Sequence, residues 1–179
     1  MRVLVAYASK YGSTKGIAEF IAGRLRSKGL DVDSKNVNDI RTLNDYDAFV
    51  VGSAVFLGKW MSEASDFLLR NQNALSGRPV WLFSSGPLVL KDKQDHDTRE
   101  GALFSGELNK LNNLAHSRDH GIFFGALDSN RLSFGHKMLR KMPAARAVMP
   151  EGDLRNWTDI EGWADSIFRD LAPSLSTPT

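Results

Sequence analysis

Short runs of apolar residues, separated by segments with helical periodicity, extend along the whole chain. Three nearly continuous apolar runs, at Arg2–Tyr7, Asp47–Ser53 and Pro79–Ser84, have the pattern of strands that are buried on both faces of a sheet. A further apolar run, at His120–Leu127, predicts another strand. Apolar and polar residues alternate over Leu30–Val37, which is the pattern of an edge strand.

Between these strands, apolar residues recur at intervals of three and four. A helix is predicted at Thr14–Lys28 and is expected to end at Gly29. Further helices are predicted from Met61 to Leu75, near Leu103–Ala115 and at Trp157–Leu171. Each has one apolar face, so we expect these helices to pack on the sheet.

This alternation of strands and helices determines the predicted fold class. Right-handed crossovers between the five strands predict an α/β fold, an open, doubly wound parallel sheet with helices on both faces. No repeat, low-complexity segment or domain linker interrupts the pattern. We therefore predict a single domain over 1–171, followed by a disordered tail over 172–179. Such sheets bind ligands at the carboxyl ends of their strands, where the strand order reverses.

A turn of small polar residues joins the first strand to the first helix. The N–H groups at the start of a helix and the helix dipole favour a phosphate there. The turn adds side-chain hydroxyls as donors and a glycine that lets the backbone approach a ligand closely. The alternative interpretation is an ordinary helix cap, because Ser and Thr are common at that position. The residues of this loop are Ser9, Lys10, Tyr11, Gly12, Ser13 and Thr14.

Other kinds of phosphate and metal site are excluded by missing motifs. The chain has no G-x-x-x-x-G-K-[ST] segment and no G-x-G-x-x-G after the first strand. Tyr7 and Ala8 stand where a phospho-acceptor domain would place its carboxylates. The chain has no cysteine, and its four histidines lack the spacing of metal ligands, so we predict no metal site.

Two more loops are expected at the same edge, after the next two core strands. Together they are suited to clasp a flat ring by stacking and by hydrogen bonds from the backbone. We expect Phe56 to face such a ring, and Trp60, placed at the start of a helix, to pack on the core. The second loop contributes Ala54, Val55, Phe56, Leu57, Gly58 and Lys59, and the third Ser84, Ser85, Gly86 and Pro87.

Composition agrees with one globular domain. The 179 residues are 42% hydrophobic and 25% charged. No apolar run approaches the ~20 residues of a membrane-spanning helix, and the amino-terminal run is too short for a signal-peptide core. A cytoplasmic location is therefore expected. The net charge is only +2, and no nucleic-acid partner is expected.

The charge is nevertheless unevenly distributed, and the segment 128–150 is basic. A short helix is predicted at Leu132–Met142, with an apolar side flanked by basic residues. Such a segment is suited to an anionic membrane surface at the inner face of the cell membrane, to an acidic partner or to substrate carboxylates. Alternatively, its apolar side packs on the sheet. Its basic residues include Arg131, Lys137, Arg140 and Lys141.

The loops resemble those of the flavodoxin family, whose members bind FMN in this way. Ser9, Gly12 and Thr14 match the hydroxyl-and-glycine pattern of the family, whereas Tyr11 stands where a Thr is usual. The resemblance is closest to the flavodoxin-type, quinone-dependent protoporphyrinogen oxidases. It spans the chain to about Leu171. The segments that carry it are "YASKYGSTKGIAEFIAGRLRSKG", "YDAFVVGSAVFLGKW", "GALDSNRLSFGHKMLRKM" and "TDIEGWADSI".

The resemblance implies the strand order 2-1-3-4-5 and FMN as cofactor, held by the three loops. It implies an FMN-dependent oxidoreductase that oxidises protoporphyrinogen IX, or a related reduced substrate, and passes electrons to a quinone. The alternatives are an electron carrier without its own substrate, an NAD(P)H:quinone reductase and a relative without flavin. Carriers of this fold are typically strongly acidic, which the present chain is not. The sequence identifies no catalytic base and leaves the oligomeric state open.

Overall fold

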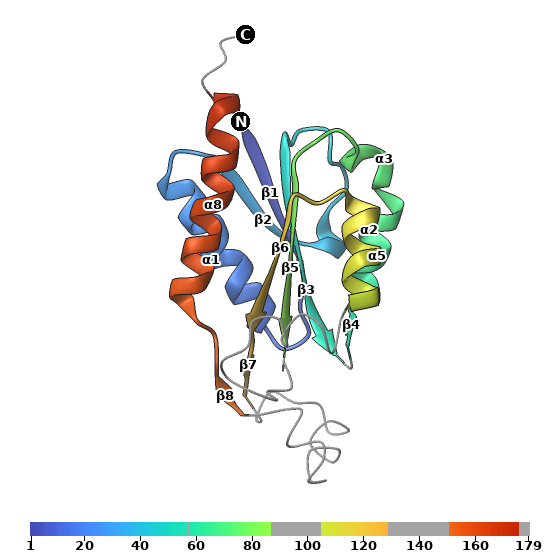
Figure 1. The fold of residues 1–179 in the computed structure, drawn as a ribbon, viewed down its shortest axis with the longest axis vertical. Coiled ribbons are helices and arrows are strands. Elements are labelled where there is room, and N and C mark those ends of the chain that lie inside the picture. The colour runs from blue at the N-terminus through green and yellow to red at the C-terminus, as the bar shows by residue number, and fades with distance from the viewer. Residues whose placement is uncertain (57, 87–104, 129–150, 176–179) are drawn as a thin grey trace.

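A central parallel sheet organises the molecule. The computed structural model describes residues 1–56, 58–86, 105–128 and 151–175. The strand order β2-β1-β3-β5-β6 confirms the predicted fold and the predicted order of the five long strands (Figure 1). These strands are β1 (Arg2–Ala8), β2 (Asp31–Asn36), β3 (Ala48–Phe56), β5 (Val80–Gly86) and β6 (Asp119–Phe124).

Helices cover both faces of this sheet. Helices α1 (Ser13–Ser27) and α8 (Trp157–Leu175) lie on one face, shown on the left of Figure 1. Helices α2 (Ser62–Arg70), α3 (Gln72–Leu75) and α5 (Ser105–Ala115) lie on the other, and a short 3-10 turn, η1 (Val37–Asp39), follows β2. The carboxyl ends of the parallel strands therefore meet at one open end of the sandwich.

Alternation along the strands divides the core in two. Leu4 and Phe49 pack in the cluster beneath α2, α3 and α5, whereas Val3 and Val50 pack beneath α1 and α8. All four side chains are fully buried. Because neighbouring residues of a strand point to opposite faces, a strand covered on both sides must be apolar at nearly every position. This is why the apolar runs predicted the central strands.

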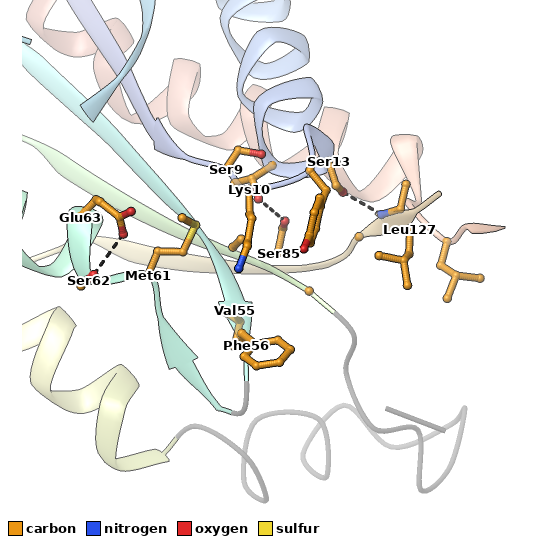
Figure 2. Close-up of a pocket in the computed structure, with 17 residues that line it drawn as sticks. Ser9, Lys10, Ser13, Val55, Phe56, Met61, Ser62, Glu63, Ser85 and Leu127 are labelled. Carbon is orange, nitrogen blue, oxygen red and sulfur yellow. Dashed lines mark hydrogen bonds between the residues drawn. The ribbon is translucent and has the colours of Figure 1, made fainter. Parts of the chain in front are cut away.

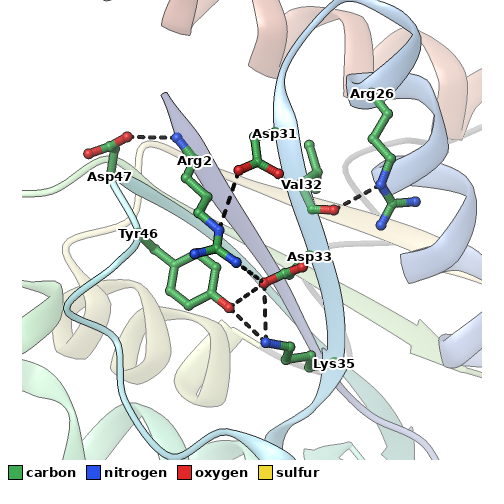
Figure 3. A network of polar contacts seen from close by, with 8 residues as sticks. All are labelled: Arg2, Arg26, Asp31, Val32, Asp33, Lys35, Tyr46 and Asp47. Atoms are coloured by element: carbon green, nitrogen blue, oxygen red, sulfur yellow. Dashed lines mark hydrogen bonds and ion pairs between the residues drawn. The ribbon is translucent and has the colours of Figure 1, made fainter.

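The edge strand β2 carries a polar network instead (Figure 3). Asp33 accepts hydrogen bonds from Tyr46 Oη at 2.6 Å, Arg2 Nη2 at 3.0 Å and Lys35 Nζ at 3.1 Å. The Tyr46 hydroxyl is the main cause of the lowered pKa of Asp33, and Lys35 and Arg2 act in the same direction. Charged side chains on an edge strand oppose pairing with a second chain.

Two strands extend further than predicted. β3 continues to Phe56 and β5 to Gly86, so most of the predicted second and third loops belong to strands. The ladder continues because Ala54 pairs with Ser85 and Gly86 pairs with Phe124. These small polar residues belong to the sheet because their backbones pair with the neighbouring strand. The pattern of apolar residues contains no sign of this pairing.

The prediction that Trp60 begins a helix is wrong. Trp60 lies in the short strand β4 (Lys59–Trp60), which turns back on β3 and pairs with Val55. Gly58 has φ 76° in the intervening turn, a conformation that suits glycine. The two strands form a hairpin that projects beyond the sheet, and α2 begins only at Ser62.

The last predicted strand is broken at Gly125. β6 ends at Phe124, and β7 (Ala126–Leu127) pairs antiparallel with β8 (Gly152–Asp153) outside the main sheet. The chain leaves the sheet here because the Gly125 carbonyl accepts the Leu154 N–H at 3.2 Å. β7, β8 and the residues beside them thus form a ribbon at the carboxyl edge.

The predicted end of the last helix is also wrong, because α8 runs to Leu175 rather than ending at Leu171. No helix in the described ranges combines the length and apolarity needed to cross a membrane. The predicted helix at Leu132–Met142 and its basic residues lie outside the described residues, as do Leu57 and Pro87.

Candidate functional site

A cavity of about 420 Å³ opens at the carboxyl ends of β1, β3 and β5. Figure 2 shows the hydroxyl-bearing residues Ser9 and Ser13 on its α1 side and Phe56 on the opposite side, at the end of β3. The structure thus brings most of the predicted site residues together. Those that line the cavity are Ser9, Lys10, Tyr11, Ser13, Thr14, Ala54, Val55, Phe56, Ser85 and Gly86.

Gly12 forms the turn between the loop after β1 and helix α1. Gly12 is the N-cap of α1 with φ 91°, a left-handed conformation that costs little only for glycine. Its N–H donates to Ser9 Oγ at 3.1 Å, and its carbonyl accepts the Gly16 N–H at 3.0 Å. The N–H groups of the first helical residues have no acceptor within the helix, and a glycine cap offers no side chain. This helix start therefore suits an anion.

The serine hydroxyls of the loop are oriented by the backbone. Ser13 Oγ accepts the Ala126 N–H at 2.7 Å, as Ser9 Oγ accepts that of Gly12. A hydroxyl whose oxygen accepts still has its own hydrogen to donate. Thr14 Oγ1 lies 2.9 Å from Ser85 Oγ, and both side chains are buried. The loop thus presents neutral donors that its own fold has positioned.

One cation and one aromatic ring complete this side of the cavity. The Lys10 ammonium lies 5.8 Å from the centre of the Tyr11 ring, and both side chains line the cavity. Lys10 is solvent-exposed, so solvent and salt partly screen the attraction between its ammonium group and an anion at the loop. Tyr11, which stands where the family usually has a Thr, places an aromatic ring along the wall of the cavity.

The opposite wall is apolar. Val55 is buried, whereas the Phe56 ring at the hairpin end is 42% exposed. Met61 lines the cavity next to them, and its N–H donates to Ser53 Oγ at 3.0 Å and to the Ala54 carbonyl at 3.3 Å. A flat apolar group can therefore lie against the hairpin while a charged group reaches the loop.

Several predicted residues lie away from the cavity. Ser84 is buried in the sheet and accepts the Trp60 indole N–H at 2.7 Å. Gly58 forms the hairpin turn and Lys59 is exposed on β4. The prediction that Trp60 packs on the core is confirmed, because its side chain is 5% exposed and lies in the core cluster under α2.

Sequence reasoning missed two groups of lining residues. Met61, Ser62 and Glu63 belong to the start of α2, and the Ser62 hydroxyl donates to Glu63 Oε2 at 3.1 Å. A second group comes from the carboxyl end of β6 and the ribbon that follows. Gly125 could have been predicted, because it directly follows a core strand whose carboxyl end faces the site. Leu154 could not, because its place beside the cavity results from the pairing of β7 with β8. The ribbon group is Gly125, Ala126, Leu127 and Leu154.

Two close approaches shape the floor of the cavity. A Cβ at Gly86 would lie 2.8 Å from the Val55 carbonyl oxygen, and one at Gly125 would lie 3.1 Å from Ser13 Oγ. Gly86 therefore has no room for a side chain, whereas a side chain at Gly125 would press on the Ser13 hydroxyl. In the parts of the chain that the structure describes, no group of three or more His, Cys, Asp or Glu side chains is placed to hold a metal ion.

Comparison with known proteins places this geometry in context. A family model described as a flavodoxin domain matches residues 4–148. The protoporphyrinogen IX dehydrogenase [quinone] of Escherichia coli (strain K12) is 27% identical over 96 residues, which are 52% of this chain and 53% of the relative. The matched region therefore spans about half the length of that relative.

Two further proteins are similar. The NAD(P)H dehydrogenase (quinone) of Nitrobacter winogradskyi is 30% identical over 131 residues, covering 58% of this chain and 63% of the relative. The solved structure of a flavodoxin from Pseudomonas aeruginosa, a variant with serine in place of one cysteine, superposes with a TM-score of 0.57 at 15% identity, covering 96% of this chain and 99% of that one. At this identity the superposition shows a shared fold.

Proposed function

The chain belongs to the flavodoxin domain family, a family of FMN-binding oxidoreductases, and from this premise we propose that the cavity at the carboxyl edge is the FMN site. The observation that carries the proposal is the polarity of its two ends. Oriented serine hydroxyls and the start of α1 lie at one end, and the apolar hairpin lies at the other. FMN has the same division between an anionic phosphate and a flat ring.

The residues present fit this group. Ser9 and Ser13 would donate to the phosphate together with the first N–H groups of α1. Lys10 would add a positive charge, which favours an anion at short range. The loop thus offers neutral donors and one cation to the phosphate, and the rest of the cavity is left for the ring to which the phosphate is attached.

The ring would occupy the apolar part of the cavity. Val55, Phe56 and Met61 would contact it from the β3–β4 side, and Leu127 and Leu154 from the ribbon side. Gly86 leaves room where a side chain would collide with the backbone of Val55, and Gly125 leaves room beside the Ser13 hydroxyl. When bound, FMN supplies the redox chemistry, and the protein supplies position, exclusion of water and the polar surroundings.

For the substrate, the proposal is a reduced tetrapyrrole, protoporphyrinogen IX, with a quinone as acceptor. Oxidation removes pairs of hydrogens from the porphyrinogen, and each pair converts one quinone to its quinol. Similarity to the E. coli protoporphyrinogen IX dehydrogenase supports this choice. Phe56 and Leu154, each 42% exposed beside the cavity, add an apolar rim that suits a large, mostly apolar macrocycle.

A membrane quinone would require the protein to approach a membrane surface. The basic residues Arg131, Lys137, Arg140 and Lys141 support such a contact by their charge alone. Sedimentation with anionic vesicles tests it: wild type should co-sediment at low salt, and replacement of Arg140 and Lys141 by Glu should abolish this while FMN binding persists. Equal loss of both would give the segment a folding role instead.

NAD(P)H oxidation is the second candidate, supported by similarity to the N. winogradskyi NAD(P)H dehydrogenase (quinone). One experiment separates the two. The FMN-loaded protein is mixed anaerobically with menaquinone and either protoporphyrinogen IX or NAD(P)H, and quinol formation is followed. We expect turnover with the porphyrinogen. Turnover with NAD(P)H alone would favour the second candidate, and turnover with neither would favour an electron carrier.

A further inference from the structure

A chain of buried and partly buried polar groups runs behind the apolar wall of the cavity. The Trp60 indole N–H donates to Ser84 Oγ at 2.7 Å, and Ser84 Oγ lies 2.9 Å from His120 Nε2. On the other side of the ring, His120 Nδ1 lies 2.9 Å from Asn112 Oδ1. The chain therefore connects β4, β5, β6 and α5 without entering the cavity.

The chemistry of the end groups sets the direction of these hydrogen bonds. An indole N–H can only donate, and an amide oxygen can only accept. Asn112 Oδ1 also accepts from Ser117 Oγ at 2.9 Å. A neutral His120 with its hydrogen on Nδ1 satisfies both ends, because it donates to Asn112 and accepts the Ser84 hydroxyl at Nε2.

The surroundings keep this imidazole neutral. Burial lowers the pKa of His120 to about 4, and Asp119, its neighbour in β6, acts in the opposite direction. The groups that contact the ring from β4, β5 and α5 are Trp60, Ser84 and Asn112, none of which carries a charge. At neutral pH, Nε2 is thus available as an acceptor.

Trp60 is the end of the chain that matters for the cavity. Its ring lies edge-on to His120, with centroids 5.8 Å apart and planes at 71°. Its backbone pairs with Val55, and Phe56 pairs with Lys59 in the same hairpin. Trp60 and Val55 are buried in the core and Phe56 is not, so the indole is one of the two side chains by which the core holds the hairpin.

We propose that His120 is a positioning residue for the ring-binding wall of the cavity, acting through Ser84 and Trp60 on the β3–β4 hairpin. His120 itself does not line the cavity. Loss of the His120 acceptor leaves the hydrogen of the Ser84 hydroxyl without an acceptor, so the hydroxyl no longer holds its orientation toward Trp60 and the hairpin wall at Val55 and Phe56 shifts. The inference rests on the proposed FMN site.

Adjacent serines of β5 make a matched pair of controls. Ser84 turns toward Trp60 and His120, whereas Ser85 Oγ bonds to Thr14 of the phosphate loop. Ser84 therefore serves the ring wall and Ser85 serves the phosphate end. Riboflavin, which has the ring but no phosphate, separates the two effects.

The experiment measures affinities for riboflavin and FMN by quenching of flavin fluorescence. His120→Ala and Ser84→Ala should weaken both ligands by the same factor, about fivefold to tenfold, the loss expected for one buried neutral hydrogen bond. Ser85→Ala should weaken FMN and spare riboflavin. His120→Gln, which keeps an acceptor near Ser84, should restore affinity for both.

Two further readouts exclude a merely structural role. With saturating FMN, the visible circular dichroism of the bound ring should change in His120→Ala and return in His120→Gln. The affinity of wild type for riboflavin should fall as the pH drops toward 4, and that of His120→Gln should not. Unchanged riboflavin affinity in folded His120→Ala overturns the inference alone. Failure of wild type to bind either flavin overturns the proposed function and the inference with it.

Discussion

Ser13 Oγ in the first turn of α1 accepts the backbone N–H of Ala126 in β7 at 2.7 Å. This bond connects the loop after β1 to the ribbon that follows β6. Gly125 makes it possible, because a Cβ there would press on the same hydroxyl oxygen. The loop after β1 and the ribbon that carries Leu127 and Leu154 are thus joined into one wall of the cavity.

The first prediction concerns this hydroxyl. Ser13→Ala removes the proposed donor to the phosphate and leaves the Ala126 N–H without its acceptor. A hydrogen bond to a charged group contributes about 1.5–3 kcal/mol, so FMN affinity should fall by about tenfold to a hundredfold. Riboflavin affinity should change much less. Equal losses for the two flavins, measured by fluorescence quenching, would place the phosphate elsewhere.

Gly12 supports a second prediction. Gly12→Asp puts a side chain on a backbone with φ 91° and a carboxylate at the helix start that we propose for the phosphate, so FMN binding should be abolished. Gly29→Asp is the matched control, because Gly29 has φ 90° at the other end of α1 and open space around it. It should lower stability by about 1 kcal/mol and leave FMN affinity unchanged. Near-normal affinity in Gly12→Asp, measured by calorimetry, would refute the assignment of the loop.

Phe56 supports a third prediction. Because its ring is 42% exposed, Phe56→Ala should hardly change the denaturation midpoint. The loss of an aromatic contact of about 0.5–1.5 kcal/mol should weaken FMN and riboflavin alike, by about threefold to tenfold. Leu69→Ala, at a residue of α2 that is 60% exposed and outside the cavity, controls for the loss of exposed apolar surface. If the two variants bind flavin equally well, Phe56 does not contact the ring.

A fourth prediction concerns the packing of α1 on α8. Hydrogen bonds from Arg24 Nε and Nη2, both 2.8 Å long, lower the pKa of Asp165 to about 2. A lowered carboxyl pKa means that the unfolded chain binds the proton more readily, so this contribution to stability is complete above the unfolded pKa and disappears as the pH falls through the folded one.

Urea denaturation of wild type and Asp165→Asn checks this dependence. The difference in stability should be constant at and above about pH 5 and should shrink between about pH 4 and pH 2. Arg24→Gln should show a similar dependence, because it removes the main partner of Asp165, with Lys28 remaining as a weaker one. A difference that persists unchanged at pH 2 would show that the ion pair is not its cause.

The central strands could be predicted because helices cover both of their faces. Val3 and Leu4 are both fully buried, so an unbroken apolar run was informative there. The strand ends were not predictable in the same way. Ser84, Ser85 and Gly86 extend β5 through backbone pairing, which small polar residues permit but do not signal.

The residues of the candidate site likewise fall into those that the sequence pattern could predict and those that it could not. Ser9, Gly12 and Ser13 were predictable because hydroxyls and a glycine at a strand-to-helix junction have a direct chemical meaning. Leu154 and the acceptor role of Ser13 were not. Both depend on a ribbon formed by residues 126–127 and 152–153, and no local pattern specifies that pairing.

A crystal structure of the protein grown with saturating FMN tests the central claim most directly. The account predicts the phosphate within hydrogen-bonding distance of the Ser9 and Ser13 hydroxyls and the first N–H groups of α1, with the ring against Phe56. A phosphate bound elsewhere, or a vacant cavity at saturating FMN, would contradict it.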